Sequence, residues 1–149
     1  MGASIARLFY RKGKDRQLST FYNTQLVKLH QTYREKGFEI LAFPCNQFMK
    51  QEPKTNQEIK TFLQTKFNVE FPLFDKVDVN GENAHDIYKY LRINTPTLVR
   101  KEKNDIRMIP WNFSKFLVDS NGKVVGYFDP SVQPRKLRQM IENMLDSSD

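Results

Sequence analysis

The chain has 149 residues, a formal net charge of +7, 39% hydrophobic residues and one cysteine. This length fits one domain with a substantial core, and the hydrophobic content excludes a disordered chain. No apolar run is long enough to cross a bilayer. One cysteine excludes an intramolecular disulfide and is typical of a reducing compartment. The cations are spread along the chain without interleaved aromatic residues, so we expect no nucleic-acid partner.

The first sixteen residues are basic and contain a single acidic side chain, Asp15. Ile5, Leu8 and Phe9 have the spacing of a short amphipathic helix, whereas residues 6–10 would fit a short strand equally well. A basic amphipathic start is typical of a mitochondrial address. We therefore expect a cytoplasmic or mitochondrial protein that is not secreted.

Apolar spacing predicts the first long helix at residues 19–36, ended by Gly37. An uninterrupted apolar run predicts a buried strand at 38–43, stopped by Pro44. A capping box at 55–58 then opens a second helix with one apolar stripe. Extended structure at a sheet edge is predicted for residues 71–75, where a proline interrupts the run.

Asn83 is the predicted N-cap of a third helix, and the polar segment 94–106 is predicted to be a loop. Residues 114–119 and 123–129 alternate around a turn and predict a β-hairpin. Pro134 begins the final amphipathic helix. This order of elements predicts an α/β sandwich of three layers, with a central mixed sheet and helices on both faces.

Two segments carry the most informative motifs of the chain. Residues 38–48 read FEILAFPCNQF and are followed by QEP at 51–53, and residues 111–119 read WNFSKFLVD. Both segments resemble the glutathione peroxidase family, and the resemblance spans about residues 19–145. It is closest to the compact phospholipid-hydroperoxide or thiol peroxidase type.

The resemblance implies a thioredoxin-like fold and one domain, residues 1–149, of which 1–18 form a divergent basic segment. The family reaction is the reduction of hydrogen or lipid hydroperoxides by a thiol, in the response to oxidative stress. Its site combines a cysteine or selenocysteine nucleophile with a Gln, a Trp and an Asn that donate hydrogen bonds to the anion. Gln47, Trp111 and Asn112 take the three donor positions in this chain.

The nucleophile position falls on Arg16 when the chain is counted back without gaps from the family-like block 37–41. A guanidinium stays cationic and cannot attack a peroxide. We therefore expect a family member without turnover, a pseudoenzyme retained as a binding or structural module in a larger assembly.

Cys45 provides the alternative, an active thiol peroxidase in oxidative-stress defence. In the family this cysteine accompanies the nucleophile, and its place at a strand end is typical of a small buried residue. Gln64 occupies the position of the resolving cysteine that some members use, so no intramolecular disulfide cycle can operate. Glutathione or thioredoxin would be the reductant only if the chain is active, and we expect no bound cofactor.

Family members carry a β-hairpin and a core strand before the nucleophile, whereas only fifteen residues precede Arg16 here. Residues 5–10 would replace the strand, but the hairpin has no counterpart. A protein partner is therefore expected to cover the truncated N-terminal sheet edge. An incomplete transcript is a further explanation of the short N-terminus. His30 and His85 lie on separate predicted helices, where we expect solvated or capping roles and no metal site.

Overall fold

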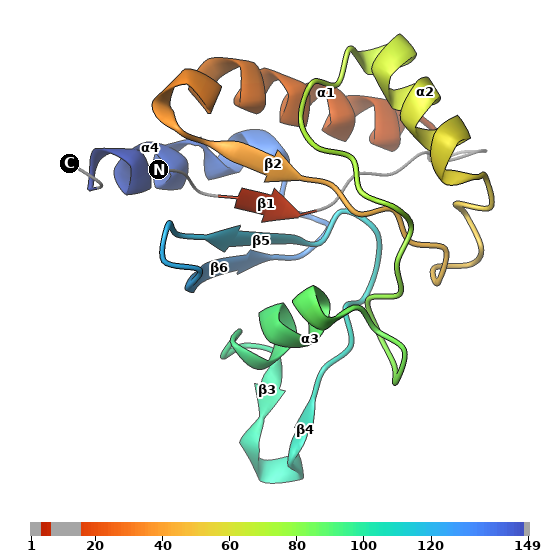
Figure 1. Cartoon of the computed structure of the whole chain (residues 1–149). Coiled ribbons are helices and arrows are strands. Elements are labelled where there is room, and N and C mark those ends of the chain that lie inside the picture. Colours follow the sequence, from red (N-terminus) through yellow and green to blue (C-terminus); the bar gives the residue numbers. More distant parts are fainter. Residues whose placement is uncertain (1–3, 7–15, 148–149) are drawn as a thin grey trace.

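The computed structural model describes residues 4–6 and 16–147, and side chains from residue 19 onward. Four strands form a mixed sheet in the order β2-β1-β5-β6. The strands are β1 (Ser4–Ala6), β2 (Glu39–Leu41), β5 (Lys115–Val118) and β6 (Val124–Phe128). β1 runs parallel to β2 and antiparallel to β5, and β5 pairs antiparallel with β6 (Figure 1).

Helices cover both faces of this sheet. Side chains of β5 show this directly, because neighbouring residues of a strand point to opposite faces. Lys115 faces Tyr22 of α1 (Arg16–Tyr33), whereas Phe116 packs edge-on against Tyr88 of α3 (Asp86–Ile93). The segment η3 (Pro134–Leu137) continues into α4 (Arg138–Asp146) and lies beside α1. α2 (Asn56–Phe67) also lies beside α1 (Figure 1).

The predictions that rest on sequence signals within a few residues of each other are confirmed. The first helix begins at Arg16 and continues as η1 (Arg34–Lys36). It ends at Gly37, whose φ of 93° only glycine adopts freely. Thr55 and Glu58 form the predicted capping box of α2. The extended stretch 71–75 forms a parallel bridge to the end of β2 through Leu73 and Ala42.

Signals that depend on more distant partners are partly wrong. The predicted loop 94–106 contains a small antiparallel sheet of β3 (Val99–Arg100) and β4 (Asp105–Ile106), joined by η2 (Lys101–Lys103). The guanidinium of Arg100 binds the carboxylate of Asp105 across this pair. The ion pair and the turn at Asn104, with φ of 49°, give a polar sequence a regular structure.

The two histidines, His30 and His85, have different structural roles. His85 caps α3 in place of Asn83, because its Nδ1 accepts a hydrogen bond from the backbone N–H of Ile87 at 3.1 Å. The capping role expected for His85 is thus confirmed, and the Asn83 cap is wrong. The role expected for His30 is also wrong: its ring is buried, with Nε2 2.9 Å from the carboxylate of Glu39.

The N-terminal predictions are only partly covered by the described residues. Ser4–Ala6 form a strand, so a helix that includes Ile5 is wrong there. The remainder of the predicted helix or strand, at residues 7–10, lies outside the described residues. The prediction that the family's N-terminal hairpin has no counterpart is not tested by the described residues either. β1 lies inside the sheet, whose outer strands are β2 and β6. The protein partner expected at the sheet edge stays a prediction. None of the helices in the described chain combines the length and apolar character of a membrane span.

Candidate active site

The candidate site lies at one edge of the sheet. β1 and β2 are parallel and end at this edge, and the antiparallel β5 begins there (Figure 1). The segment after β2 carries Cys45 and Gln47, and the segment before β5 carries Trp111 and Asn112. Carboxyl ends of strands are where open α/β folds place their chemistry.

The Gln47 carboxamide is held by the backbone of a third segment. Its Oε1 accepts hydrogen bonds from the N–H groups of Val79 at 2.8 Å and Asn80 at 3.0 Å. Its Nε2 donates to the carbonyl oxygen of Asn80 at 2.8 Å. These bonds fix the amide even though the residue is exposed, and they use one of the two Nε2 hydrogens.

Cys45 lies in the interior and is only 1% exposed. Its Sγ accepts a hydrogen bond from the Gln47 N–H at 3.4 Å and donates one to Gln47 Oε1 at 3.5 Å. Cys45 is therefore buried, as the sequence predicts for a small residue at the end of a strand. Both Cys45 hydrogen bonds are made to Gln47, so the sulfur is enclosed by its own segment and does not face solvent.

The two motif segments lie in contact. The Trp111 ring lies 5.5 Å from the Phe48 ring, and Asn112 Nδ2 donates to Gln51 Oε1 at 3.2 Å. Asn112 is buried, whereas Trp111 is half-buried. The next residue, Phe113, has a left-handed backbone with φ of 63°. That conformation is rare for a bulky residue, and it turns the chain between the Trp-Asn pair and β5.

The fourth predicted position, Arg16, is the first residue of α1. The structure describes its backbone, and its side chain lies outside the described part. The first half of α1 is tied to the motif segment by Tyr22, whose ring packs edge-on against Phe113 at 5.1 Å. The Tyr22 hydroxyl also donates to the carbonyl oxygen of Pro130 at 2.8 Å.

Three buried polar residues next to these segments were not predicted from the sequence as site residues. Asn80 binds both backbone polar groups of Ile109 at 2.8 Å, although Asn80-Gly81 is typical of a simple turn. Glu52 is fully buried, and Asn46 Oδ1 accepts a hydrogen bond from its backbone N–H. The Glu52 signal was present in the sequence, since a glutamate within the QEP motif is part of the resemblance.

Lys115 is the third. Its Nζ donates to the carbonyl oxygens of Phe113 at 2.6 Å and Asp129 at 3.2 Å, and it lies 5.5 Å from the centre of the Tyr22 ring. Burial lowers the pKa of Lys115 to about 8, against a smaller opposing effect of the Asp129 carboxylate. Lys115 thus joins the left-handed turn at Phe113 to the end of β6.

Comparisons with known proteins decide the family. The glutathione peroxidase family model matches residues 17–92. A probable phospholipid hydroperoxide glutathione peroxidase from Mesembryanthemum crystallinum is 48% identical over 124 residues, which cover 83% of this chain and 69% of that protein. The chain belongs to the glutathione peroxidase family.

Solved structures agree with this assignment. The crystal structure of T. cruzi GPX1 matches with a TM-score of 0.69 at 28% identity, over 99% of this chain and 84% of that one. A thioredoxin-family thiol:disulfide interchange protein from Chlorobium tepidum TLS matches with a TM-score of 0.58 at 14% identity, over 97% and 80% of the two chains. The predicted thioredoxin-like α/β fold and the family resemblance are both confirmed.

The contact between the two motif segments runs through Phe48 and Trp111, which are sequence neighbours of two other predicted residues. Gln47 lies next in sequence to Phe48, whose ring contacts Trp111, and Trp111 precedes Asn112. Neutral amide and indole donors can hold an anion without titrating near neutral pH. In the described part of the chain, no cluster of three or more His, Cys, Asp or Glu side chains is arranged to hold a metal ion.

Proposed function

We propose that this glutathione peroxidase family member does not turn over peroxides and acts as a binding or structural module. The observation that carries the proposal is the identity of the residue that begins α1. Arg16 occupies the position that the resemblance assigns to the nucleophile, and a guanidinium has no nucleophilic form at physiological pH.

The state of Cys45 supports the same proposal. A peroxidatic sulfur must meet its substrate, and the Cys45 side chain is 1% exposed. The thiol also donates to Gln47 Oε1 rather than to solvent. A peroxide could reach this sulfur only after the segment around Cys45 opens, which would break the Gln47 contacts with Val79 and Asn80.

The absence of a second thiol further restricts the alternative, an active peroxidase that uses Cys45. If Cys45 attacked a peroxide, the O–O bond would break, and the sulfur would be oxidised to a sulfenic acid while an alcohol or water leaves. Gln64 stands where some relatives resolve this species, and the chain holds no other cysteine. Two external thiols would then have to reduce it, the first forming a mixed disulfide and the second releasing the Cys45 thiol.

The test is a turnover assay on the full chain with hydrogen peroxide and with a lipid hydroperoxide. Glutathione and thioredoxin serve as reductants in separate arms, and Cys45→Ser is the matched variant. We expect wild type and variant to consume peroxide at the same background rate. Wild-type turnover that Cys45→Ser abolishes would establish the active alternative, and mass spectrometry would then show a sulfenic acid on Cys45.

The proposal extends to the compartment of the module and to its partner. The basic, acid-poor composition of residues 1–16 favours the cytoplasm or mitochondria, and a protein partner would cover an outer strand of the sheet, β2 or β6. Size-exclusion chromatography of the endogenous protein in extracts tests the larger assembly. Elution at the mass of the free chain, 17.7 kDa, would count against it.

A further inference from the structure

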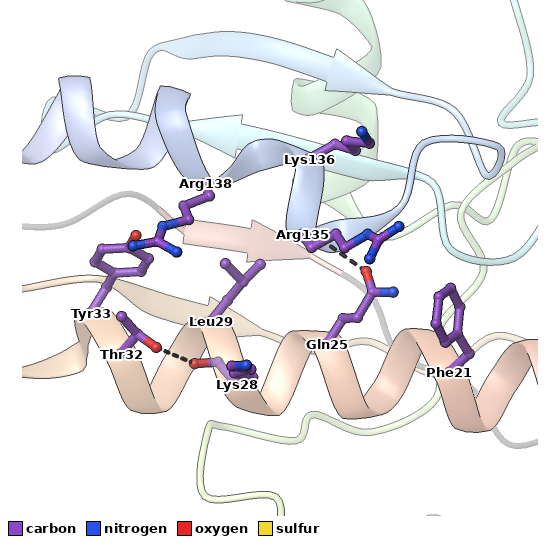
Figure 2. A pocket seen from close by; sticks show the side chains of 9 residues that line it. All are labelled: Phe21, Gln25, Lys28, Leu29, Thr32, Tyr33, Arg135, Lys136 and Arg138. Atoms are coloured by element: carbon purple, nitrogen blue, oxygen red, sulfur yellow. Dashed lines mark hydrogen bonds between the residues drawn. The ribbon is translucent and has the colours of Figure 1, made fainter.

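A hollow of about 500 Å³ lies between α1 and the η3–α4 segment (Figure 2), and none of its lining residues is one of the predicted site residues. Small-molecule sites in proteins span this size range. The two walls of the hollow are held together by Gln25 of α1. Its Oε1 accepts from the backbone N–H of Arg135 at 3.0 Å, and its Nε2 donates to Gln133 Oε1 at 3.4 Å. The hollow is therefore formed before any ligand arrives.

The polar lining of the hollow is positively charged. It contains Lys28 from α1 and Arg135, Lys136 and Arg138 from the opposite wall, and no Asp or Glu. Figure 2 shows Arg135 and Arg138 extending between the two helical segments, whereas Lys136 points away from α1. Positive charges from both walls therefore line the same hollow.

The cations of the hollow are not neutralised equally. Arg138 Nε donates to the carboxylate of Glu142 at 3.0 Å, and the Tyr33 hydroxyl binds the same carboxylate. Within residues 16–147, by contrast, no carboxylate pairs with Lys28 or Arg135. Both are exposed on facing walls, so the hollow presents two uncompensated positive charges.

The remaining lining is apolar and aromatic. Phe21 is 44% exposed at one end of the hollow, and Leu29 forms its floor between the walls (Figure 2). An exposed aromatic ring beside uncompensated cations suits a ligand with an anionic group and an uncharged body. Arginine forks and lysine ammonium groups are the usual protein partners of phosphate oxygens.

We propose that this hollow binds a phosphate ester, with Lys28 and Arg135 on the phosphate and Phe21 against the organic part. The proposal stands independently of the peroxidase question, because none of these residues belongs to the candidate active site. A phosphate ester could come from a free metabolite or from the headgroup of a phospholipid, and the two sources share this chemistry.

The experiment compares the full chain with two double variants of equal charge. Lys28→Gln with Arg135→Gln removes the cations of the hollow. Lys101→Gln with Lys103→Gln removes two exposed cations from η2, which links β3 to β4. Calorimetric titration with inorganic pyrophosphate at low salt tests the free phosphate arm. Sedimentation with phosphatidylcholine vesicles, with and without phosphatidic acid, tests the headgroup arm.

We expect the variant of the hollow to weaken binding by about tenfold or more, and the η2 variant to leave it within about twofold. Loss in the pyrophosphate arm shows that the hollow binds free phosphate groups, and loss confined to phosphatidic acid vesicles identifies a lipid headgroup. Equal weakening by both variants would reduce the effect to net charge and overturn the proposal, as would failure of wild type to bind either probe. The single variant Lys28→Gln gives the same test with one charge if the double variant fails to fold.

Discussion

The Lys115 ammonium group lies in the protein interior, where its hydrogen bonds within the described residues go to two backbone carbonyl oxygens, those of Phe113 and Asp129. Burial lowers the pKa of Lys115 to about 8, from an ordinary value of 10.5, so Lys115 loses its proton at a lower pH in the folded chain than in the unfolded chain. Between these two pH values the unfolded chain binds more protons than the folded chain. Stability due to Lys115 therefore rises with pH in this window, and the full cost of burying the charge is present below it.

Replacement of Lys115 by methionine should remove this pH dependence. From about pH 7 to about pH 9.5, the free energy of unfolding of wild type should rise relative to Lys115→Met by about 2 kcal/mol. Urea unfolding at both pH values measures the difference, with Lys123→Met on an exposed side chain as control. A wild-type curve parallel to that of Lys115→Met would mean that Lys115 keeps its charge throughout.

Gln47 is the second residue for which a structural role can be tested apart from any catalytic role. Its three hydrogen bonds to Val79 and Asn80 join the segment after β2 to the chain before α3. Gln47→Ala should lower the free energy of unfolding by about 1–2 kcal/mol, with water replacing part of the loss at this exposed site. Thermal unfolding measures it, and Gln64→Ala on the exposed face of α2 is the control. Equal stability of the two variants would contradict a structural role for the Gln47 amide.

Residue identities at the site could be predicted from motifs, but residue environments could not. The sequence places Gln47 and Trp111 through a family resemblance. The Gln47 hydrogen bonds depend on residues more than thirty positions away, which no local pattern reveals. The burial of Lys115 could not be predicted either, because a lysine in an alternating strand normally faces solvent. Here β5 has strands on both sides and helices on both faces, so residues 115–117 are all buried.

At the scale of elements, α2 shows how a local signal fixes a helix start. Thr55 Oγ1 accepts from the Glu58 N–H at 3.2 Å, and Glu58 Oε2 accepts from the Thr55 N–H at 2.8 Å. Thr55→Ala should lower the free energy of unfolding by about 1 kcal/mol, because the Glu58 N–H at the helix start loses the acceptor that Thr55 Oγ1 provides. Chemical denaturation measures this cost. Thr65→Ala, exposed on the same helix, should change the stability by less than about 0.5 kcal/mol, and a similar loss in both would exclude the cap as the cause.

Elements that need distant partners explain the incorrect sequence predictions. The cap of α2 and the stop at Gly37 involve neighbours within four residues and were predictable. β3 and β4 are two-residue strands, too short for a periodic signal. Arg92 of α3 also holds β4, by donating to the carbonyl oxygens of Ile106 and Arg107. His30 is buried because Glu39 and Phe71 meet it from two other segments.

At the scale of the whole molecule, one sheet edge brings the motif segments together. The parallel pairing of β1 with β2 and the antiparallel pairing of β1 with β5 place the end of β2 and the start of β5 at this edge. The thioredoxin-like architecture was predictable because the order of elements and both motifs pointed to it. Arg16 is the first residue of α1, and its place at the family's nucleophile position remains part of the proposal.

The central claim is that the donor residues persist while the nucleophile is absent, and replacing Arg16 tests it most directly. Arg16→Cys, Arg16→Ser and wild type are compared for glutathione oxidation with hydrogen peroxide. A new thiolate at residue 16 would be oxidised to a sulfenic acid by the peroxide and then reduced by two glutathione molecules in succession. We predict turnover by Arg16→Cys alone, with wild type and Arg16→Ser at background. Wild-type turnover as fast as that of Arg16→Cys would contradict the account.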